Sequence, residues 1–299
     1  MNRPDACLRR VAVCTAVLLA SCAVAAQFIP SSPFGFDRGQ DVSPTFDGWV
    51  RNADGTFSLY FGYLNRNAAE EIHIPIGPEN RVDPGGDRGQ PSYFYPSGSQ
   101  EPAGLLDRDV TGRRRWWAFK VDVPRDWTDK QRLSWILTSR GRTNQAVAWL
   151  QPEYEVTADF IRQNAADGHL FSRGQFDTGN RPPSISGSAT QSVTGTEATV
   201  VVTATDDGRP EPAGQQTQAR RQPQGLRVRW ITYRGPARVK FDPETQGPFE
   251  ATSAKAETRA TFSVPGSYRL RAVASDGQLY AVHDTDVTVS PRPAVQTAR

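Results

Sequence analysis

Aspartates in the second half of the sequence have the side chain that a hard cation prefers as a ligand. The pair Asp206–Asp207 directly precedes a glycine, and so does Asp276. Calcium binds about six to eight oxygen atoms, often from carboxylates on neighbouring turns. The predicted calcium ligands are therefore Asp206, Asp207 and Asp276, if they share one end of the fold; Asp284 and Asp286 are also expected at strand ends. The alternative is that aspartate before glycine is ordinary turn chemistry and holds no ion. No other cofactor is predicted.

Residue types that catalyse hydrolysis are present, but no known motif arranges them. The three histidines lie far apart, and none belongs to a zinc motif such as HExxH. Two glutamate pairs have the carboxyl groups that glycoside hydrolases place about 5–10 Å apart across a cleft. The alternative for the second pair, Glu153 and Glu155, is that they share a solvated strand face. The residues are His73, His169, His283, Glu70, Glu71, Glu153 and Glu155. The sequence also lacks a G-x-S-x-G elbow, a Walker loop and a Rossmann fingerprint.

The first half of the sequence has more aromatic residues than one inner face of a sheet can hold. Strand alternation puts Tyr60 and Trp116 on the outward side and Trp117 on the inward side. Exposed aromatic clusters stack sugar rings or mark protein interfaces. The predicted ligand-binding residues are Tyr60, Trp116, Tyr93 and Tyr95. The alternative is that a long loop, residues 77–100, folds over these side chains and buries them.

The composition excludes several classes of protein. The chain has 299 residues, of which 37% are hydrophobic and 10% aromatic, with 25 Gly and 23 Pro. It is rich in turn formers, but it is too aromatic for a disordered chain. The formal net charge of +3 is too small to indicate a nucleic-acid partner. We interpret the run of Arg113–Arg115 as a solvated strand edge that discourages strand pairing.

Residues 1–26 have the parts of a secretory signal peptide. Arg3, Arg9 and Arg10 form a positive segment, and the apolar residues 11–20 follow it. This apolar segment is shorter than the roughly 20 residues that span a bilayer. We therefore expect export to the periplasm, the cell surface or the extracellular space.

Two routes of processing are open for this leader. Cleavage after Ala26 would release a soluble chain, whereas the sequence LASC at residues 19–22 resembles a bacterial lipobox with Cys22 as the lipidated residue. All three cysteines, Cys7, Cys14 and Cys22, lie in the leader, so the mature chain has no thiol and no disulfide. Contact with a membrane is expected only through this lipid anchor.

The rest of the chain has the alternation of β-strands and no long helical run. Phe57, Leu59, Phe61 and Tyr63 share one face of a strand that follows an Asp-Gly turn. The pattern predicts an all-β fold with two antiparallel β-sandwich domains in tandem. The predicted organisation is a signal peptide at 1–26, an extended lead-in at 27–45, a sandwich at 46–155, a linker with a short helix at 156–184, a second sandwich at 185–290 and a disordered tail at 291–299.

The second block resembles the polycystic-kidney-disease (PKD) and cadherin-like family of immunoglobulin-type sandwiches. The matching stretches are residues 180–183 (NRPP), 200–208 (VVVTATDDG), 226–230, 264–270 (VPGSYRL), 275–277 and 286–289. The resemblance implies a buried strand-C aromatic at Trp230 and a tyrosine, Tyr268, packed between the sheets. It also implies a spacer, stalk or contact module outside the cytoplasm, with calcium at turn carboxylates in some members. The first block resembles only uncharacterised exported bacterial β-sandwich proteins, which implies no activity.

Together these patterns predict an exported, non-enzymatic module that binds or spaces at the cell envelope. Its expected partner is an unidentified protein or glycan. The alternative is a carbohydrate-binding accessory protein that uses the aromatic face of the first sandwich, and the remote alternative is a hydrolase.

Overall fold

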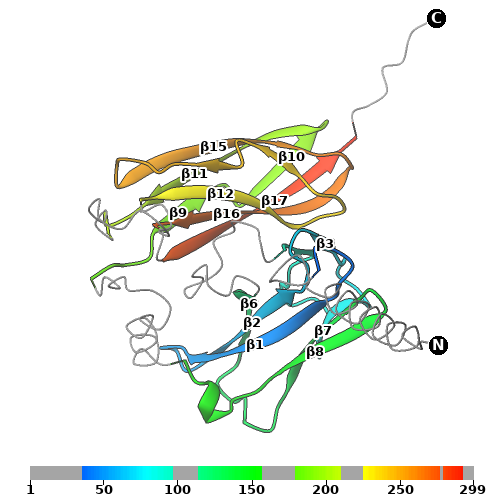
Figure 1. The fold of residues 1–299 in the computed structure, drawn as a ribbon. Helices are drawn as coiled ribbons and strands as arrows, with labels where there is room; N and C mark the ends of the chain where they lie inside the picture. Colours follow the sequence, from blue (N-terminus) through cyan, green and yellow to red (C-terminus); the bar gives the residue numbers. More distant parts are fainter. Residues whose placement is uncertain (1–35, 97–113, 157–178, 210–224, 277–278, 292–299) are drawn as a thin grey trace, which may run out of the picture. The chain divides into compact units, whose positions relative to one another are not determined.

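The computed structural model describes residues 36–96, 114–156, 179–209, 225–276 and 279–291 (Figure 1). The predicted signal peptide with Cys22, the predicted short helix, His169 and the tail from residue 292 lie outside these ranges. Within the described ranges the chain is all-β, as predicted, apart from one 3-10 turn at Pro152–Tyr154. No helix in this part of the chain is long and apolar enough to cross a membrane.

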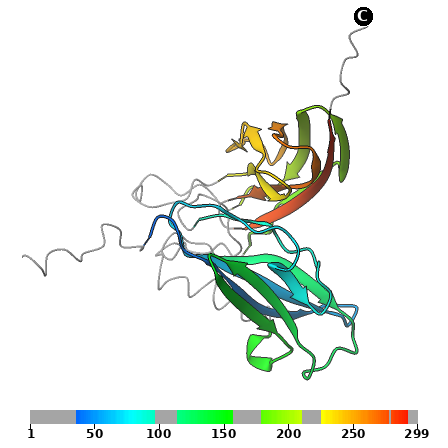
Figure 2. The ribbon, with the colours of Figure 1, turned by 90° about the vertical axis from the view of Figure 1, so that its right-hand side faces the viewer.

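The first sandwich has two three-stranded antiparallel sheets and one short strand pair. One sheet has the order β1-β2-β6, the other has the order β4-β7-β8, and β3 pairs with β5. Figure 2 shows the green strands β7 and β8 in one layer and the blue strands β1 and β2 in the other. The bounds are β1 Val42–Arg51, β2 Phe57–Asn65, β3 Ile72–His73, β4 Asn80–Asp83, β5 Tyr93–Phe94, β6 Arg114–Val123, β7 Leu133–Ser139 and β8 Arg142–Ala148.

Tight turns fix the register of two hairpins in this sandwich. In the turn between β1 and β2, Gly55 has a φ of +86° and its N–H donates to the Asn52 carbonyl at 3.0 Å. Between β7 and β8, Arg140 and Gly141 have φ values of 52° and 73°. Positive φ at both central residues is the type I′ pattern, whose twist matches that of the flanking strands. The first of these turns is the Asp-Gly turn that the sequence predicts.

The core of the first sandwich lies between its two sheets. Phe57, Leu59, Phe61 and Tyr63 are all buried, which confirms the predicted inward face of β2. From the other sheet the fully buried Trp135 packs edge-on against Phe61, with the ring centroids 6.2 Å apart. Truncating a buried tryptophan costs about 3–5 kcal/mol, so this contact is central to the stability of the domain.

Two predicted boundaries in this sandwich are wrong. The lead-in expected at 27–45 ends early, because β1 begins at the buried Val42, which pairs with Asn65. The loop expected at 77–100 contains β4 and β5, because the buried Asn80 side chain donates to the carbonyls of Ile74 and Pro91. A buried amide satisfied in this way ties the segment to its neighbours.

The orientation predicted for Trp117 is also wrong. The register of β2 and β6 shifts at a bulge: Phe61 pairs with Phe119, and Tyr63 pairs with Arg115. Trp117 lies inside this bulge with a φ of 54°, and its ring packs tilted against that of the outward-facing Tyr60, with the ring centroids 4.6 Å apart. A bulge re-aims side chains, so simple alternation fails there.

The second sandwich packs a four-stranded sheet, β13-β15-β11-β9, against a five-stranded sheet, β10-β17-β16-β12-β14. Its strands are antiparallel, as predicted, except that β10 runs parallel to β17. The reason is that the chain leaves β9 in one sheet and continues as β10 in the other. The bounds are β9 Ser184–Gly187, β10 Thr190–Thr194, β11 Glu197–Thr205, β12 Arg227–Arg234, β13 Lys240–Asp242, β14 Thr245–Gln246, β15 Ser253–Thr261, β16 Gly266–Ser275 and β17 Tyr280–Ser290.

Aromatic residues hold the core of this sandwich. Trp230 on β12 is fully buried, and Tyr268 on β16 packs against Phe262 with the ring centroids 4.8 Å apart. The Tyr268 hydroxyl donates to the carbonyl of Val264 at 2.6 Å. A tyrosine bonded to the backbone just upstream of it is the tyrosine corner of immunoglobulin-type sandwiches.

Candidate functional site

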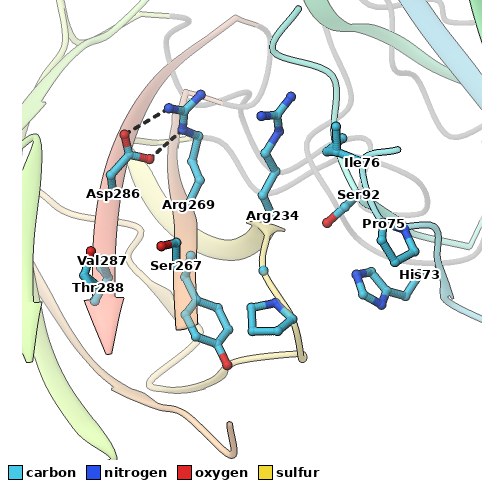
Figure 3. Close-up of a pocket in the computed structure, with 13 residues that line it drawn as sticks. His73, Pro75, Ile76, Ser92, Arg234, Ser267, Arg269, Asp286, Val287 and Thr288 are labelled. Atoms are coloured by element: carbon cyan, nitrogen blue, oxygen red, sulfur yellow. Dashed lines mark hydrogen bonds and ion pairs between the residues drawn. The ribbon is translucent and has the colours of Figure 1, made fainter. Parts of the chain in front are cut away.

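A groove of about 770 Å³ lies on the outer face of the five-stranded sheet (Figure 3). Its floor is made by outward-facing side chains of β16 and β17 and by the end of β12. Its wall is made by β3, the residues that follow β3, and Ser92, which precedes β5. The two sandwiches belong to one compact unit that begins at Asp37, and both contribute to this groove.

The floor of the groove carries two arginines, each paired with a carboxylate, of which Asp286 also lines the groove. Arg269 on β16 donates from Nε and Nη2 to the carboxylate of Asp286, its register partner on β17, at 2.7 and 2.9 Å. Arg234 makes two bonds to Asp87 at 3.0 and 2.8 Å, and its Nε donates to the Gln90 carbonyl at 2.5 Å. These arginine hydrogen bonds lower the pKa of both aspartates, so both pairs are ionised at neutral pH. Figure 3 shows Arg234 and Arg269 side by side.

The wall of the groove combines an imidazole with a buried hydroxyl. The ring of His73 stacks on Tyr93 at 4.3 Å. Burial lowers the pKa of His73, and a hydrogen bond with the backbone of Gly235 only partly opposes this, so the ring is neutral at pH 7. The side chain of Ser92 is 2% exposed, and its Oγ has no hydrogen-bond partner among the residues that the structure describes.

Hydrogen bonds between the two sandwiches hold the wall against the floor. The Ser92 N–H donates to the Tyr233 carbonyl at 3.1 Å, and the Tyr233 hydroxyl donates to the Gly89 carbonyl at 2.7 Å. The hydroxyl of Tyr95 donates to the Thr232 carbonyl at 2.9 Å. Three bonds between residues this far apart in the sequence fix the width of the groove. We call these contacts, together with the Arg271 contacts that follow, the junction.

A third arginine pair belongs to the junction and not to the groove. Arg271 on β16 donates to both oxygens of Asp284 at 2.7 and 2.9 Å and to the carbonyl of Ala118 at 3.0 Å. Its guanidinium lies 3.7 Å from the centroid of the Tyr233 ring. Side-chain exposure is 15% for Arg271 and 29% for Asp284, against 33% and 52% for Arg269 and Asp286. The two pairs therefore have the same geometry and different burial.

The structure separates the four predicted ligand-binding residues. Tyr93 and Tyr95 are buried, which agrees with the alternative in which the 77–100 segment covers them. Burial and the charge of Glu71 raise the pKa of Tyr93 to about 12. Tyr60 is half-buried against Trp117, and Trp116 is half-buried beneath the guanidinium of Arg114 at 3.5 Å. Tyr95 therefore belongs to the junction and Tyr93 packs against His73, and neither forms one exposed face with Tyr60 and Trp116.

The three predicted calcium ligands all accept hydrogen bonds, but Oδ1 of Asp206 is buried without a partner among the described residues. Asp276 is buried and accepts from the Leu279 N–H at 2.6 Å and from the Asn180 side chain at 3.0 Å. Asp207 accepts from the Arg181 N–H at 3.0 Å. The neighbouring residues Asn180 and Arg181 bond Asp276 and Asp207, so these carboxylates lie at one end of the sandwich, and Asp206 adjoins Asp207. Burial, and then the charges of Asp276 and Asp207, raise the pKa of Asp206.

These carboxylates do not form a recognisable metal site in the described part of the chain. Within it, no group of three or more His, Cys, Asp or Glu side chains is placed to hold an ion. Asp284 and Asp286 are engaged by arginines on the neighbouring strand. The calcium site therefore stays a prediction.

The candidate acid–base residues are also dispersed. Glu70 pairs with Arg140, and Glu71 pairs with Arg238 at 3.3 Å. Glu153 lies in the 3-10 turn, with Glu155 directly after it, so the prediction that the two share a strand face is wrong; the proline at position 152 starts the turn. His283 contacts the Ser188 carbonyl at 3.2 Å.

Sequence reasoning did not identify the groove, although one signal for it is present. The arginines at 269 and 271 and the aspartates at 284 and 286 alternate on two strands joined by a short hairpin loop. The number of residues between the two strands sets their register. In the observed antiparallel register, each arginine on β16 lies opposite an aspartate on β17. The wall residues have no comparable signal, because His73 and Ser92 reach the groove only through the junction.

Comparisons with known proteins add little to this description. No protein-family model matches the sequence, and no curated protein matches it. The PKD domain of human KIAA0319 is similar at 14% identity over 43% of this chain and 99% of that chain, with a TM-score of 0.21. Fibronectin(III)-like modules of Clostridium thermocellum CbhA are similar at 11% identity over 86% of this chain and 98% of that chain, with a TM-score of 0.22.

A third solved structure belongs to an enzyme. An endo-fucoidan hydrolase of glycoside hydrolase family 107 is similar at 9% identity over 86% of this chain and 29% of that chain, with a TM-score of 0.24. Likenesses at these scores carry no argument about function. The all-β fold of two sandwiches stands on the sheets of the chain itself.

Proposed function

We propose that this chain is an exported, non-enzymatic binding module and that the groove is its ligand-binding surface. The observation that carries the proposal is the floor of the groove, where Arg234 and Arg269 lie side by side on the paired strands β12 and β16, each in an ionised pair with an aspartate. Strand positions hold such groups more firmly than loops do, and preorganised polar groups favour binding. The volume of about 770 Å³ is within the usual range for small-molecule sites, roughly 300–1,000 Å³.

The electrostatics of the groove support binding over chemistry. General acid–base catalysis needs a group with a suitable pKa within reach of the reacting proton. The arginine pairs keep Asp87 and Asp286 ionised, and the neutral ring of His73 is stacked on Tyr93. Each polar group that the groove offers is thus suited to hydrogen bonding with a ligand.

Export is supported by the sequence of residues 1–26 and by the position of all three cysteines within it. A chain without disulfides depends on its core for stability outside the cell. Two sandwiches with buried aromatic cores provide this.

Filling the groove tests the proposal. Thr288 is an exposed residue of β17 on the floor, and Thr199 is an exposed residue of β11 in the other sheet. Thr288→Trp places an indole in the groove, and Thr199→Trp is the matched control. We expect Thr288→Trp to abolish binding of the purified protein to the cell-envelope fraction of the source cells in a pull-down assay, while Thr199→Trp leaves it intact. Equal binding by both variants would remove the groove as the ligand surface.

A further inference from the structure

The groove has a buried hydroxyl on one side that nothing in the described chain engages. Ser92 uses its N–H to bond Tyr233 and its carbonyl to accept from Ile74 at 2.9 Å, so its backbone is satisfied. Its Oγ lines the groove without a partner among the described residues, although the residue is 2% exposed. Buried polar atoms are nearly always hydrogen-bonded, so this hydroxyl points to a bound group that both donates and accepts.

The floor opposite Ser92 offers donors and acceptors without net charge. Arg234 and Arg269 contribute two positive charges and Asp286 one negative charge, and Asp87, which lies outside the lining, balances the charge of Arg234. A guanidinium has five N–H donors and a carboxylate has about four acceptor sites, so a two-bond pair leaves several of each for a ligand. Both arginine charges are balanced by aspartates, so an anionic ligand gains little attraction from them. Both aspartate charges are balanced by arginines, so a cationic ligand gains equally little.

The remaining lining is amphipathic. Pro75 and Pro236 are exposed and Ile76 is half-exposed, which gives apolar surface at the side of the groove. Ser267 and Thr288 are exposed on the floor strands and add two hydroxyl groups. Figure 3 shows Ser267 and Thr288 on the floor strands and Pro75 and Ile76 on the opposite side. A ligand that fits has apolar C–H faces and many hydroxyl groups.

We propose that the groove binds an uncharged, polyhydroxylated ligand, a segment of a neutral glycan chain. The Ser92 hydroxyl and the Arg269–Asp286 pair bond to its hydroxyl groups, and Pro75, Ile76 and Pro236 contact its ring faces. This inference rests on the proposed function and specifies the ligand class of the same groove. It places the sugar contact away from Tyr60 and Trp116, where the sequence predicted it.

Calorimetry with defined ligands tests this inference. The probes are cellohexaose, xylohexaose, chitohexaose and maltoheptaose as neutral chains, with dextran sulfate and polygalacturonate as anionic chains and an oligo-alanine peptide as a non-glycan. We expect at least one neutral chain to bind, with an affinity that changes by less than about twofold between low and high ionic strength. Binding only to the anionic chains, only to the peptide, or to none of the probes would overturn the inference.

Two substitutions make the test specific to the groove. Ser92→Ala removes the unpartnered hydroxyl, and we expect it to weaken neutral-glycan binding about threefold to tenfold. Ser253→Ala, an exposed serine on β15 in the other sheet, is the matched control and leaves binding unchanged. Asp286→Asn leaves the Arg269 charge without its counter-ion, so we expect weaker binding of the neutral chain and new, salt-sensitive binding of dextran sulfate.

The outcomes separate this inference from the proposed function. If Thr288→Trp abolishes binding to the envelope fraction while no neutral chain binds the wild-type protein, the ligand class is wrong and the groove stays the binding surface. If a neutral chain binds but Ser92→Ala and Asp286→Asn bind it like wild type, the glycan lies elsewhere and this inference fails. If Thr288→Trp leaves envelope binding intact, the proposed function itself fails.

Discussion

Two arginines on β16, Arg269 and Arg271, each pair with an aspartate, and comparing the two pairs measures what the junction contributes to stability. Arg271 and Arg269 are two residues apart on one strand, and each bonds an aspartate of β17 through two hydrogen bonds. Only Arg271 also bonds across to the Ala118 carbonyl and lies over the Tyr233 ring. Arg271→Ala and Arg269→Ala therefore remove the same type of ion pair in two different environments.

The expected cost follows from the burial of each pair. Removing one partner of a buried pair costs about 3–5 kcal/mol, because the other charge is left in a medium of low dielectric constant. Asp284 keeps 29% of its side chain exposed, so water offsets part of this cost, while the lost Ala118 bond and the Tyr233 contact add to it. We expect Arg271→Ala to lower the free energy of unfolding by about 2–4 kcal/mol. We expect Arg269→Ala to lower it by about 0–1 kcal/mol, the usual value for exposed pairs.

Urea unfolding followed by tryptophan fluorescence measures both losses, with the denaturant slope held common to the variants. Hydrogen exchange then locates the effect: Arg271→Ala should increase exchange in β6 of the first sandwich as well as in β16 and β17, and Arg269→Ala should affect the second sandwich alone. An equal or larger loss for Arg269→Ala would refute the reasoning, because burial would then not determine the energy of these pairs.

Other features give further tests. Tyr268→Phe removes the 2.6 Å bond to the Val264 carbonyl, and we expect it to lower the free energy of unfolding by about 1 kcal/mol in the same urea assay; an unchanged midpoint would show that the tyrosine corner is not stabilising. The pKa of Asp286 is lowered in the folded state by its bonds to Arg269, so its contribution to stability is present above the unfolded value of 3.8 and is lost as the pH falls through the lower folded value. Asp286→Asn should therefore reduce the loss of thermal stability below about pH 4, and an identical acid profile for both proteins would contradict this. Because Asp207 and Asp276 already accept N–H groups, we expect EDTA to leave the melting temperature unchanged, and a drop would instead support the predicted calcium site. Mass spectrometry of the native protein should show an N-terminus at Gln27 if signal peptidase cleaves after Ala26, whereas a diacylglycerol adduct on Cys22 would establish the lipoprotein route.

Strand alternation predicted the fold well where large apolar residues fill one face. The inward residues of β2 followed from alternation, and the burial of Trp230 was what the resemblance to PKD-like sandwiches implied. Alternation did not predict the strand β15. Its only apolar residues are Ala254, Ala256 and Ala260, which differ little in hydrophobicity from their neighbours. Alternation also failed at Trp117, because a bulge with positive φ changes the face without changing the residue pattern.

The groove was harder to predict than the fold, because its parts meet only through long-range contacts. The sequence predicted Tyr93 and Tyr95 as ligand-binding residues, but both are buried: Tyr95 bonds Thr232 in the junction, and Tyr93 stacks on His73. The groove itself depends on arginine–aspartate pairs that look like ordinary surface charge until the register of β16 and β17 is known. Ser92 becomes notable only once its burial is known, since a serine before a tyrosine carries no signal of its own.

The parallel pairing of β10 with β17 affects how the second sandwich is made during synthesis. In its sheet β10 has β17 as its sole neighbour, and strands β11 to β16 are translated between the two. Until the ribosome has completed β17, β10 has no partner and the groove floor lacks the strand that carries Asp286 and Thr288. We therefore expect nascent chains truncated before β17 to stay protease-sensitive in this domain, so that the binding surface forms only after the polypeptide is nearly finished.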